Sequence, residues 1–62
     1  MPSIRIDGPA ISVEQKRNMV KEMTEAAARA YGLPREIMVV LIRENGPENV
    51  GIGGELLADR KK

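Results

Sequence analysis

The 62-residue sequence contains no cysteine, histidine, tryptophan or phenylalanine, and Tyr31 is its single aromatic residue. The absence of cysteine excludes both a disulfide framework and thiolate chemistry. The absence of histidine removes the commonest metal ligand and the commonest general base, so neither a metal site nor a cofactor is expected. Because aromatic side chains are nearly missing, the sequence offers no platform on which nucleic-acid bases could stack.

An excess of charge of one sign and long apolar runs are also absent. The sequence has ten basic and nine acidic residues, so its net charge is +1. Such a small charge argues against nucleic acid as a partner. No apolar segment is long enough for a membrane span, and no leader peptide is recognisable. We therefore expect no membrane association and a cytoplasmic location.

The short length predicts one domain, residues 1–62, close to the lower limit for a chain that folds alone. A domain of about 60 residues buries only about 60% of the surface that its unfolded chain exposes. Such small scaffolds usually depend on disulfides, a metal or oligomerisation. With the first two excluded by composition, we expect self-association.

The first half of the chain predicts a strand followed by a helix. Isoleucines alternate with polar residues over 3–7, a pattern typical of a strand, which Gly8-Pro9 ends. Ser12 and Gln15 are spaced as a capping box, and Gly32 is suited to the helix C-terminus. The expected buried stripe has a spacing of three and four residues. It comprises Met19, Val20, Met23, Ala27, Ala30 and Tyr31.

The second half predicts a central strand and a short β arm. Residues 37–42 are six consecutive apolar residues, which indicates a strand covered on both faces. The helix can cover one face, and we expect a second subunit on the other. Strand, helix and strand form a βαβ unit with parallel strands and a right-handed crossover. The glycine-rich segment 50–56 lacks the GxGxxG spacing of a phosphate loop and predicts a C-terminal β-hairpin. The expected class is α/β.

Pro2 is the residue with the most distinctive potential chemistry. If Met1 is removed, Pro2 carries a free secondary amine. A free α-amino group has a pKa of about 7.7–8.0, and apolar surroundings lower the pKa of an amine. A base whose pKa lies near the working pH is an efficient proton acceptor. A structural role is the alternative, because proline is also tolerated at the first position of a strand.

The whole chain resembles the 4-oxalocrotonate tautomerase family, as a divergent member. The resemblance is strongest at Gly51-Ile52-Gly53-Gly54-Glu55-Leu56. Its other elements are Pro2, Glu14-Gln15-Lys16, Glu22, Glu25-Ala26, Pro34 and the apolar strand 37–42. The resemblance implies a cofactor-independent isomerase of enol or dienol acids in which Pro2 is the general base. It also implies a dimer-based homo-oligomer, often a hexamer, whose active sites draw on neighbouring chains.

Three residues depart from the best-known members of that family. Ile11 and Val39 stand where those members have arginines that bind substrate carboxylates, and Val50 stands where they have an aromatic residue. Together with Ile52, these side chains predict an apolar substrate pocket around Pro2. Low activity on the family's dicarboxylic dienol is therefore expected, because a carboxylate clamp contributes several kcal/mol to transition-state stabilisation.

Arg43 is the first candidate for a substitute cation, because it has the same strand parity as Val39. Weaker candidates are Arg35 and the C-terminal Arg60, Lys61 and Lys62, which could fold over a neighbour's pocket. Three alternatives remain open. The substrate could be a monocarboxylic enol or keto acid, the amine could serve water addition to an unsaturated acid, or the chain could be a catalytically silent oligomerisation module.

Overall fold

The computed structural model describes residues 1–60 and has the element order β–α–β–β–β. The strands are β1 (Ser3–Gly8), β2 (Val39–Glu44), β3 (Gly51–Ile52) and β4 (Glu55–Leu56), and the helix is α1 (Val13–Tyr31). Short 3₁₀ turns occupy Arg35–Ile37, Pro47–Asn49 and Leu57–Asp59. Lys61 and Lys62, two of the suggested cations, lie outside the described residues. No helix within residues 1–60 has the length and apolarity needed to cross a bilayer.

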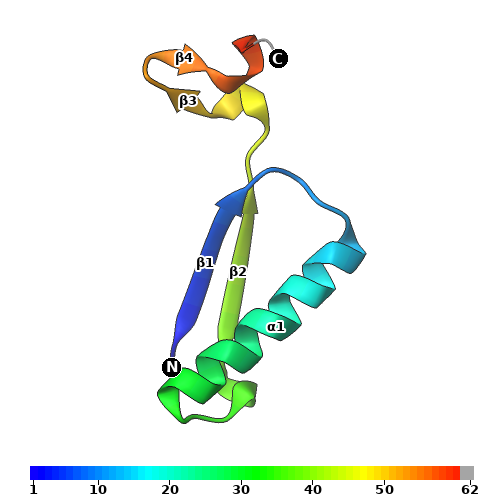
Figure 1. Cartoon of the computed structure of the whole chain (residues 1–62), viewed down its shortest axis with the longest axis vertical. Coiled ribbons are helices and arrows are strands. Elements are labelled where there is room, and N and C mark those ends of the chain that lie inside the picture. Colours follow the sequence, from blue (N-terminus) through cyan, green and yellow to red (C-terminus); the bar gives the residue numbers. More distant parts are fainter. Residues whose placement is uncertain (61–62) are drawn as a thin grey trace.

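β1 and β2 form the predicted parallel pair, with α1 as the crossover (Figure 1). The register runs from Ser3 opposite Val39 to Gly8 opposite Glu44. The second strand begins later and ends later than the apolar run 37–42 predicted. Ile37 belongs to the 3₁₀ turn that follows Pro34, and pairing with β1 extends β2 through Arg43 and Glu44. Backbone pairing, rather than apolarity, therefore sets the limits of this strand.

The ends of α1 are capped as the sequence predicted. The Ser12 hydroxyl accepts a hydrogen bond from the Gln15 backbone N–H at 3.1 Å, and the Gln15 side-chain oxygen accepts one from the Ser12 backbone N–H at 2.9 Å. Gly32 adopts the left-handed conformation with φ 67°, and its N–H donates to Ala28 at 2.9 Å. This pairing satisfies one of the helix's terminal carbonyls.

The predicted buried stripe of α1 is wrong at its C-terminal end. Met19, Val20, Met23 and Ala27 are half-buried, but Ala30 is exposed and Tyr31 is 64% exposed. The reason is length. A helix of 19 residues spans about 28 Å, whereas a six-residue strand spans about 20 Å. The helix is therefore longer than the strands, and Ala30 and Tyr31 in its last turn stay exposed in the single chain.

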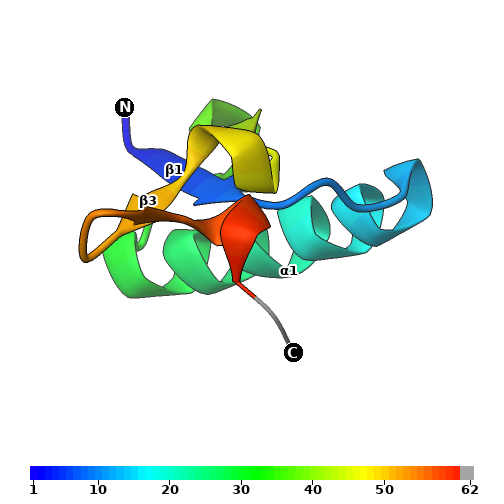
Figure 2. The ribbon, with the colours of Figure 1, turned by 90° about the horizontal axis from the view of Figure 1, so that it is seen from above.

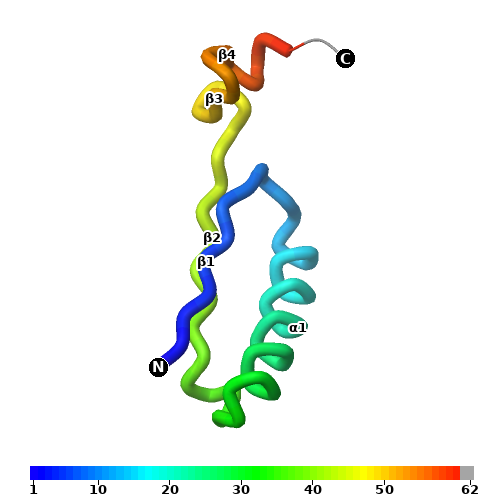
Figure 3. The backbone as a smooth tube through the Cα atoms, turned by 60° about the vertical axis from the view of Figure 1, so that its left-hand side comes forward, coloured from blue at the N-terminus to red at the C-terminus, as the bar shows by residue number. Residues whose placement is uncertain are grey.

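The two faces of the β1–β2 pair have different environments. Ile4, Ile6, Val40 and Ile42 point toward α1 and are half-buried. The opposite face, which we call the open face, carries the residues of the other parity. It comprises Ser3, Arg5, Asp7, Val39, Leu41 and Arg43. Figures 2 and 3 show that α1 lies on one side of the strands and that no other described segment covers the open face.

β3 and β4 form the predicted C-terminal hairpin, which extends beyond the carboxyl end of β2 (Figure 1). Gly53 and Gly54 make its turn with φ values of 62° and 85°, a conformation for which glycine is favoured at both positions. The strands are only two residues long, and the chain turns into 3₁₀ geometry at Leu57. The Leu57 N–H donates to the Val50 carbonyl at 2.8 Å and closes the arm.

The isolated chain is extended and has no fully buried residue among those described. It exposes 5155 Å², whereas a compact protein of this mass exposes about 4,000 Å². Its radius of gyration is 15.1 Å, compared with about 11 Å for a compact domain of this length. Ile52, Leu41 and Leu56 are 50%, 50% and 43% exposed. The chain therefore presents the surface of a subunit.

Candidate active site

Pro2 lies at the amino end of the parallel strand pair. Its carbonyl accepts a hydrogen bond from the Val39 backbone N–H at 3.2 Å, so the first residue before β1 is tied to the first residue of β2. Pro2 is half-buried, whereas Met1 is 89% exposed. The Met1–Pro2 peptide bond therefore lies next to solvent, while the proline that follows it is held in place by the sheet.

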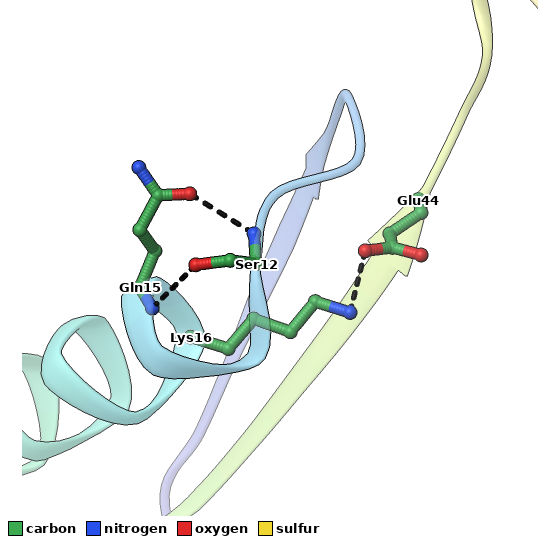
Figure 4. Close-up of polar contacts among 4 residues, drawn as sticks. All are labelled: Ser12, Gln15, Lys16 and Glu44. Carbon is green, nitrogen blue, oxygen red and sulfur yellow. Dashed lines mark hydrogen bonds and ion pairs between the residues drawn. The ribbon is translucent and has the colours of Figure 1, made fainter.

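Ile11 lies at the opposite end of the sheet, in the connection between β1 and α1. The next residues form the helix cap, and the Lys16 Nζ pairs with the Glu44 carboxylate at 2.5 Å (Figure 4). The hydrogen bond from Lys16 holds the pKa of Glu44 below its usual value, with a further contribution from the backbone N–H of Ile11. These contacts fasten the segment that carries Ile11 to the carboxyl end of β2.

Val50 and Ile52 lie on the arm that follows β2. Val50 is half-buried and lines an open, mainly apolar groove of about 440 Å³ between the carboxyl end of the sheet and the arm. The remaining lining residues come from both sides of this groove. They are Asp7, Gly8, Pro9, Asn45, Pro47 and Leu57. Ile52 lies on β3 and is half-exposed.

One chain by itself does not bring the predicted pocket residues together. Pro2 and Val39 lie at the amino end of the sheet, while Ile11 and Val50 lie at its carboxyl end. The six-residue strands separate the two ends by about 20 Å. A pocket that contains all of these side chains therefore needs parts of more than one chain.

Arg43 lies on the open face at the carboxyl end of β2. Its Nε is 3.7 Å from an Asp7 carboxylate oxygen. The weaker candidates also have acidic neighbours, since Arg35 lies 3.6 Å from Glu25 and Arg60 lies 3.5 Å from Glu55. Each predicted substitute cation within residues 1–60 is thus already paired with a carboxylate in the single chain.

Arg5 was not among the cations that the sequence suggested. This residue lies on the open face, opposite Leu41 in the register, and no Asp or Glu side chain of residues 1–60 lies within ion-pair distance of it. The signal was present in the alternation of β1, where Ile4 and Ile6 point one way and Arg5 the other. What the sequence could not supply was the pairing state of the other arginines.

Comparisons with known proteins identify the family. Residues 2–60 match the family model described as tautomerase enzyme. The 2-hydroxymuconate tautomerase of Bacillus subtilis is 39% identical over 46 residues, which cover 74% of each chain. Among solved structures, DmpI from Archaeoglobus fulgidus is 43% identical with a TM-score of 0.87, over 94% of this chain and 100% of that one.

A second solved structure is informative about assembly. It is the heterohexameric 4-oxalocrotonate tautomerase from Chloroflexus aurantiacus, which is 29% identical with a TM-score of 0.89. The match covers 98% of this chain and 100% of that one. Three findings identify the family. They are the match of residues 2–60 to the family model, the βαβ-plus-hairpin fold and the named relatives. The chain belongs to the 4-oxalocrotonate tautomerase family.

Proposed function

We propose that the protein is a cofactor-independent tautomerase of enol or dienol acids in which the amine of Pro2 is the general base. The observation that carries the proposal is the position of Pro2. It is half-buried, tied to Val39 by a backbone hydrogen bond, and follows the exposed Met1. After Met1 is removed, the neutral amine takes a proton from one site of the substrate. The resulting ammonium returns that proton to a carbon atom, so the enzyme is regenerated and nothing else is consumed.

The proposed site is shared between subunits of a dimer-based homo-oligomer, with a hexamer as the expected form. One chain contributes Pro2 and Val39, and neighbouring chains contribute Ile11, Val50 and Ile52. Two observations support this arrangement. The two groups lie about 20 Å apart within one chain, and the chain exposes about 1,200 Å² more surface than a compact monomer would.

The proposed substrate is a monocarboxylic enol or keto acid with an apolar body. Ile11 and Val39 provide no charge for a second carboxylate, and apolar groups around the amine favour its neutral, basic form. One cation is then enough to hold the acid. Arg43 remains the candidate from the sequence, on the open face of the same sheet.

The test begins with the intact mass of untagged protein, which tells whether Met1 has been removed. Ketonisation of enol monocarboxylates and dicarboxylates is then measured for the wild type and for Pro2→Ala. We expect Pro2→Ala to lose at least a hundredfold in kcat/KM, within the range that a general base contributes, without loss of assembly. The kcat/KM of the wild type should rise with pH as the amine loses its proton.

Two outcomes would favour the alternatives. Processed wild-type protein that assembles but ketonises no enol acid would favour a silent oligomerisation module. Turnover of unsaturated acids by water addition, lost in Pro2→Ala, would favour a hydratase that uses the same amine. Unchanged ketonisation in Pro2→Ala would exclude the proline mechanism itself.

A further inference from the structure

The C-terminal arm, residues 45–60, carries apolar side chains that stay exposed in the single chain. Ile52 is 50% exposed, Leu56 is 43% exposed and Leu57 is 37% exposed. The arm projects beyond the carboxyl end of β2, away from α1 and the paired strands (Figure 1). Several exposed apolar side chains on one projecting segment are typical of a contact with another protein surface.

The open face of the sheet is a second surface that lacks a cover. Leu41 lies in the middle of this face and is 50% exposed. Arg5 lies opposite Leu41 in the register, and no carboxylate of residues 1–60 lies within ion-pair distance of it. An arginine that is covered without a carboxylate loses its hydration and gains nothing in return. The segment that covers this face is therefore expected to bring an acidic side chain to Arg5.

The two surfaces carry charges of opposite sign. The open face has two arginines and one aspartate, whereas residues 45–60 have three acidic residues and one basic residue. Within the arm, Glu55 is paired with Arg60 at 3.5 Å. Asp59 has no basic side chain of residues 1–60 within ion-pair distance. The arm therefore offers a carboxylate that its own described neighbours do not neutralise.

The spacing of apolar and charged groups also agrees between the two surfaces. Asp59 follows Leu56 by three residues, across a 3₁₀ turn, which corresponds to about 6 Å. Arg5 and Leu41 lie on neighbouring strands, about 5 Å apart. A leucine beside an acid on the arm thus matches a leucine beside an arginine on the open face.

The exposed area is sufficient for such a contact. The chain exposes about 1,200 Å² more than a compact monomer of its mass. One partner in an interface of standard size buries about 800 Å². The arm of the single chain leaves its own open face uncovered (Figures 2 and 3), so a neighbouring chain is the source of the cover. A contact between two different surfaces passes from chain to chain and can close into a ring.

We propose that the open face receives the arm of a second copy of the chain, in which Leu56 packs on Leu41 and Asp59 forms an ion pair with Arg5. The inference rests on the homo-oligomer of the proposed function and names the contact that holds it together. The same arm carries Val50 and Ile52, which the proposed site takes from neighbouring chains. One segment then builds both the interface and part of the shared site.

Charge reversal tests the ion pair. Arg5→Glu and Asp59→Lys should each raise the protein concentration at which the oligomer dissociates about tenfold or more in sedimentation, because like charges would meet in the interface. The double variant should recover most of this loss, since opposite charges meet again. Arg17→Glu makes the same change of charge at an exposed position on α1 and should assemble as the wild type does. Single variants that assemble normally, or a double variant without recovery, would overturn the pairing.

Cross-linking tests the position of the arm. Because the chain has no cysteine, substitutions introduce the only thiols. Leu41→Cys and Leu56→Cys are refolded separately and as a mixture and then treated with a short bismaleimide, and cross-linked dimers are expected in the mixture. In the control mixture, Val13→Cys, at a position 58% exposed on α1, replaces Leu56→Cys and should not cross-link to Leu41→Cys. Dimers of Leu41→Cys alone would show that two open faces meet, and a mixture without dimers would place the arm elsewhere. Either result would overturn the proposal.

Ketonisation of enol acids by the wild type separates this inference from the proposed function. If the cross-link forms and the double variant recovers, but processed wild-type protein ketonises no enol acid, the interface stands and the tautomerase proposal fails. If the wild type ketonises enol acids but neither interface test gives its expected result, the tautomerase proposal stands and the assigned interface fails.

Discussion

Dilution is expected to lower the melting temperature of this protein strongly. No residue within 1–60 is fully buried in the single chain, and the open face of the sheet has no cover among the described segments. Most of the free energy of folding must then come from contacts between chains. In that case folding and association are one equilibrium, and Tm depends on protein concentration.

The size of the effect follows from mass action. A tenfold dilution costs about 1.4 kcal/mol for each association step. In a hexamer there are five such steps for six chains, which gives about 1.1 kcal/mol per chain. The unfolding entropy expected for a chain of 62 residues is about 0.13 kcal/mol/K. Tm should therefore fall by about 8 °C for each tenfold dilution of a hexamer, and by about 5 °C for a dimer.

The assay is thermal unfolding followed by far-ultraviolet circular dichroism over a hundredfold range of protein concentration. Sedimentation at each concentration gives the number of subunits. That number decides whether the decrease in Tm expected for a hexamer or the one expected for a dimer applies. A Tm that stays constant over that range, while sedimentation shows dissociation into single chains, would refute the reasoning. It would mean that a single chain without any fully buried residue is stable by itself.

Four further outcomes are expected. Ser12→Ala should reduce the free energy of unfolding by about 1 kcal/mol in urea titrations, because it removes the cap of α1. Gly54→Ala should reduce the free energy of unfolding by about 1 kcal/mol in the same assay, because alanine is strained at the φ of 85° that Gly54 adopts. A variant as stable as the wild type would contradict the described turn geometry. Lys16 lowers the pKa of Glu44 in the folded state. The ion pair therefore stabilises the folded protein at pH values above 4.5, the ordinary pKa of the carboxyl group, and this stabilisation is lost as the pH falls through the lowered pKa of the folded state. Glu44→Gln should therefore flatten the pH dependence of Tm in acid. Val39→Arg should lower KM for dicarboxylic enols relative to monocarboxylic ones, and an unchanged ratio would place position 39 outside the site.

Local sequence patterns determined where the helix, β1 and the C-terminal hairpin form, although not the limits of β2. Ser12, Gln15 and Gly32 act through hydrogen bonds and backbone angles that involve only their immediate neighbours, so the limits of α1 were predictable. The alternation of β1 and the glycine pair of the arm are equally local. The parallel pairing followed from the order of the elements, because a helix between two strands leaves them pointing the same way. The resemblance to the family needed nothing beyond the sequence.

Only the tertiary structure decided where these elements lie relative to one another. Ser3 and Val39 are far apart in the chain, and their register depends on how α1 packs across the sheet. That register brings Pro2 to Val39 and sends Val50 to the opposite end. It also determines which arginines meet a carboxylate and which do not. Ion pairing, exposure and the division of the pocket between chains depend on contacts between distant residues, and a pattern of neighbouring side chains carries no information about such contacts.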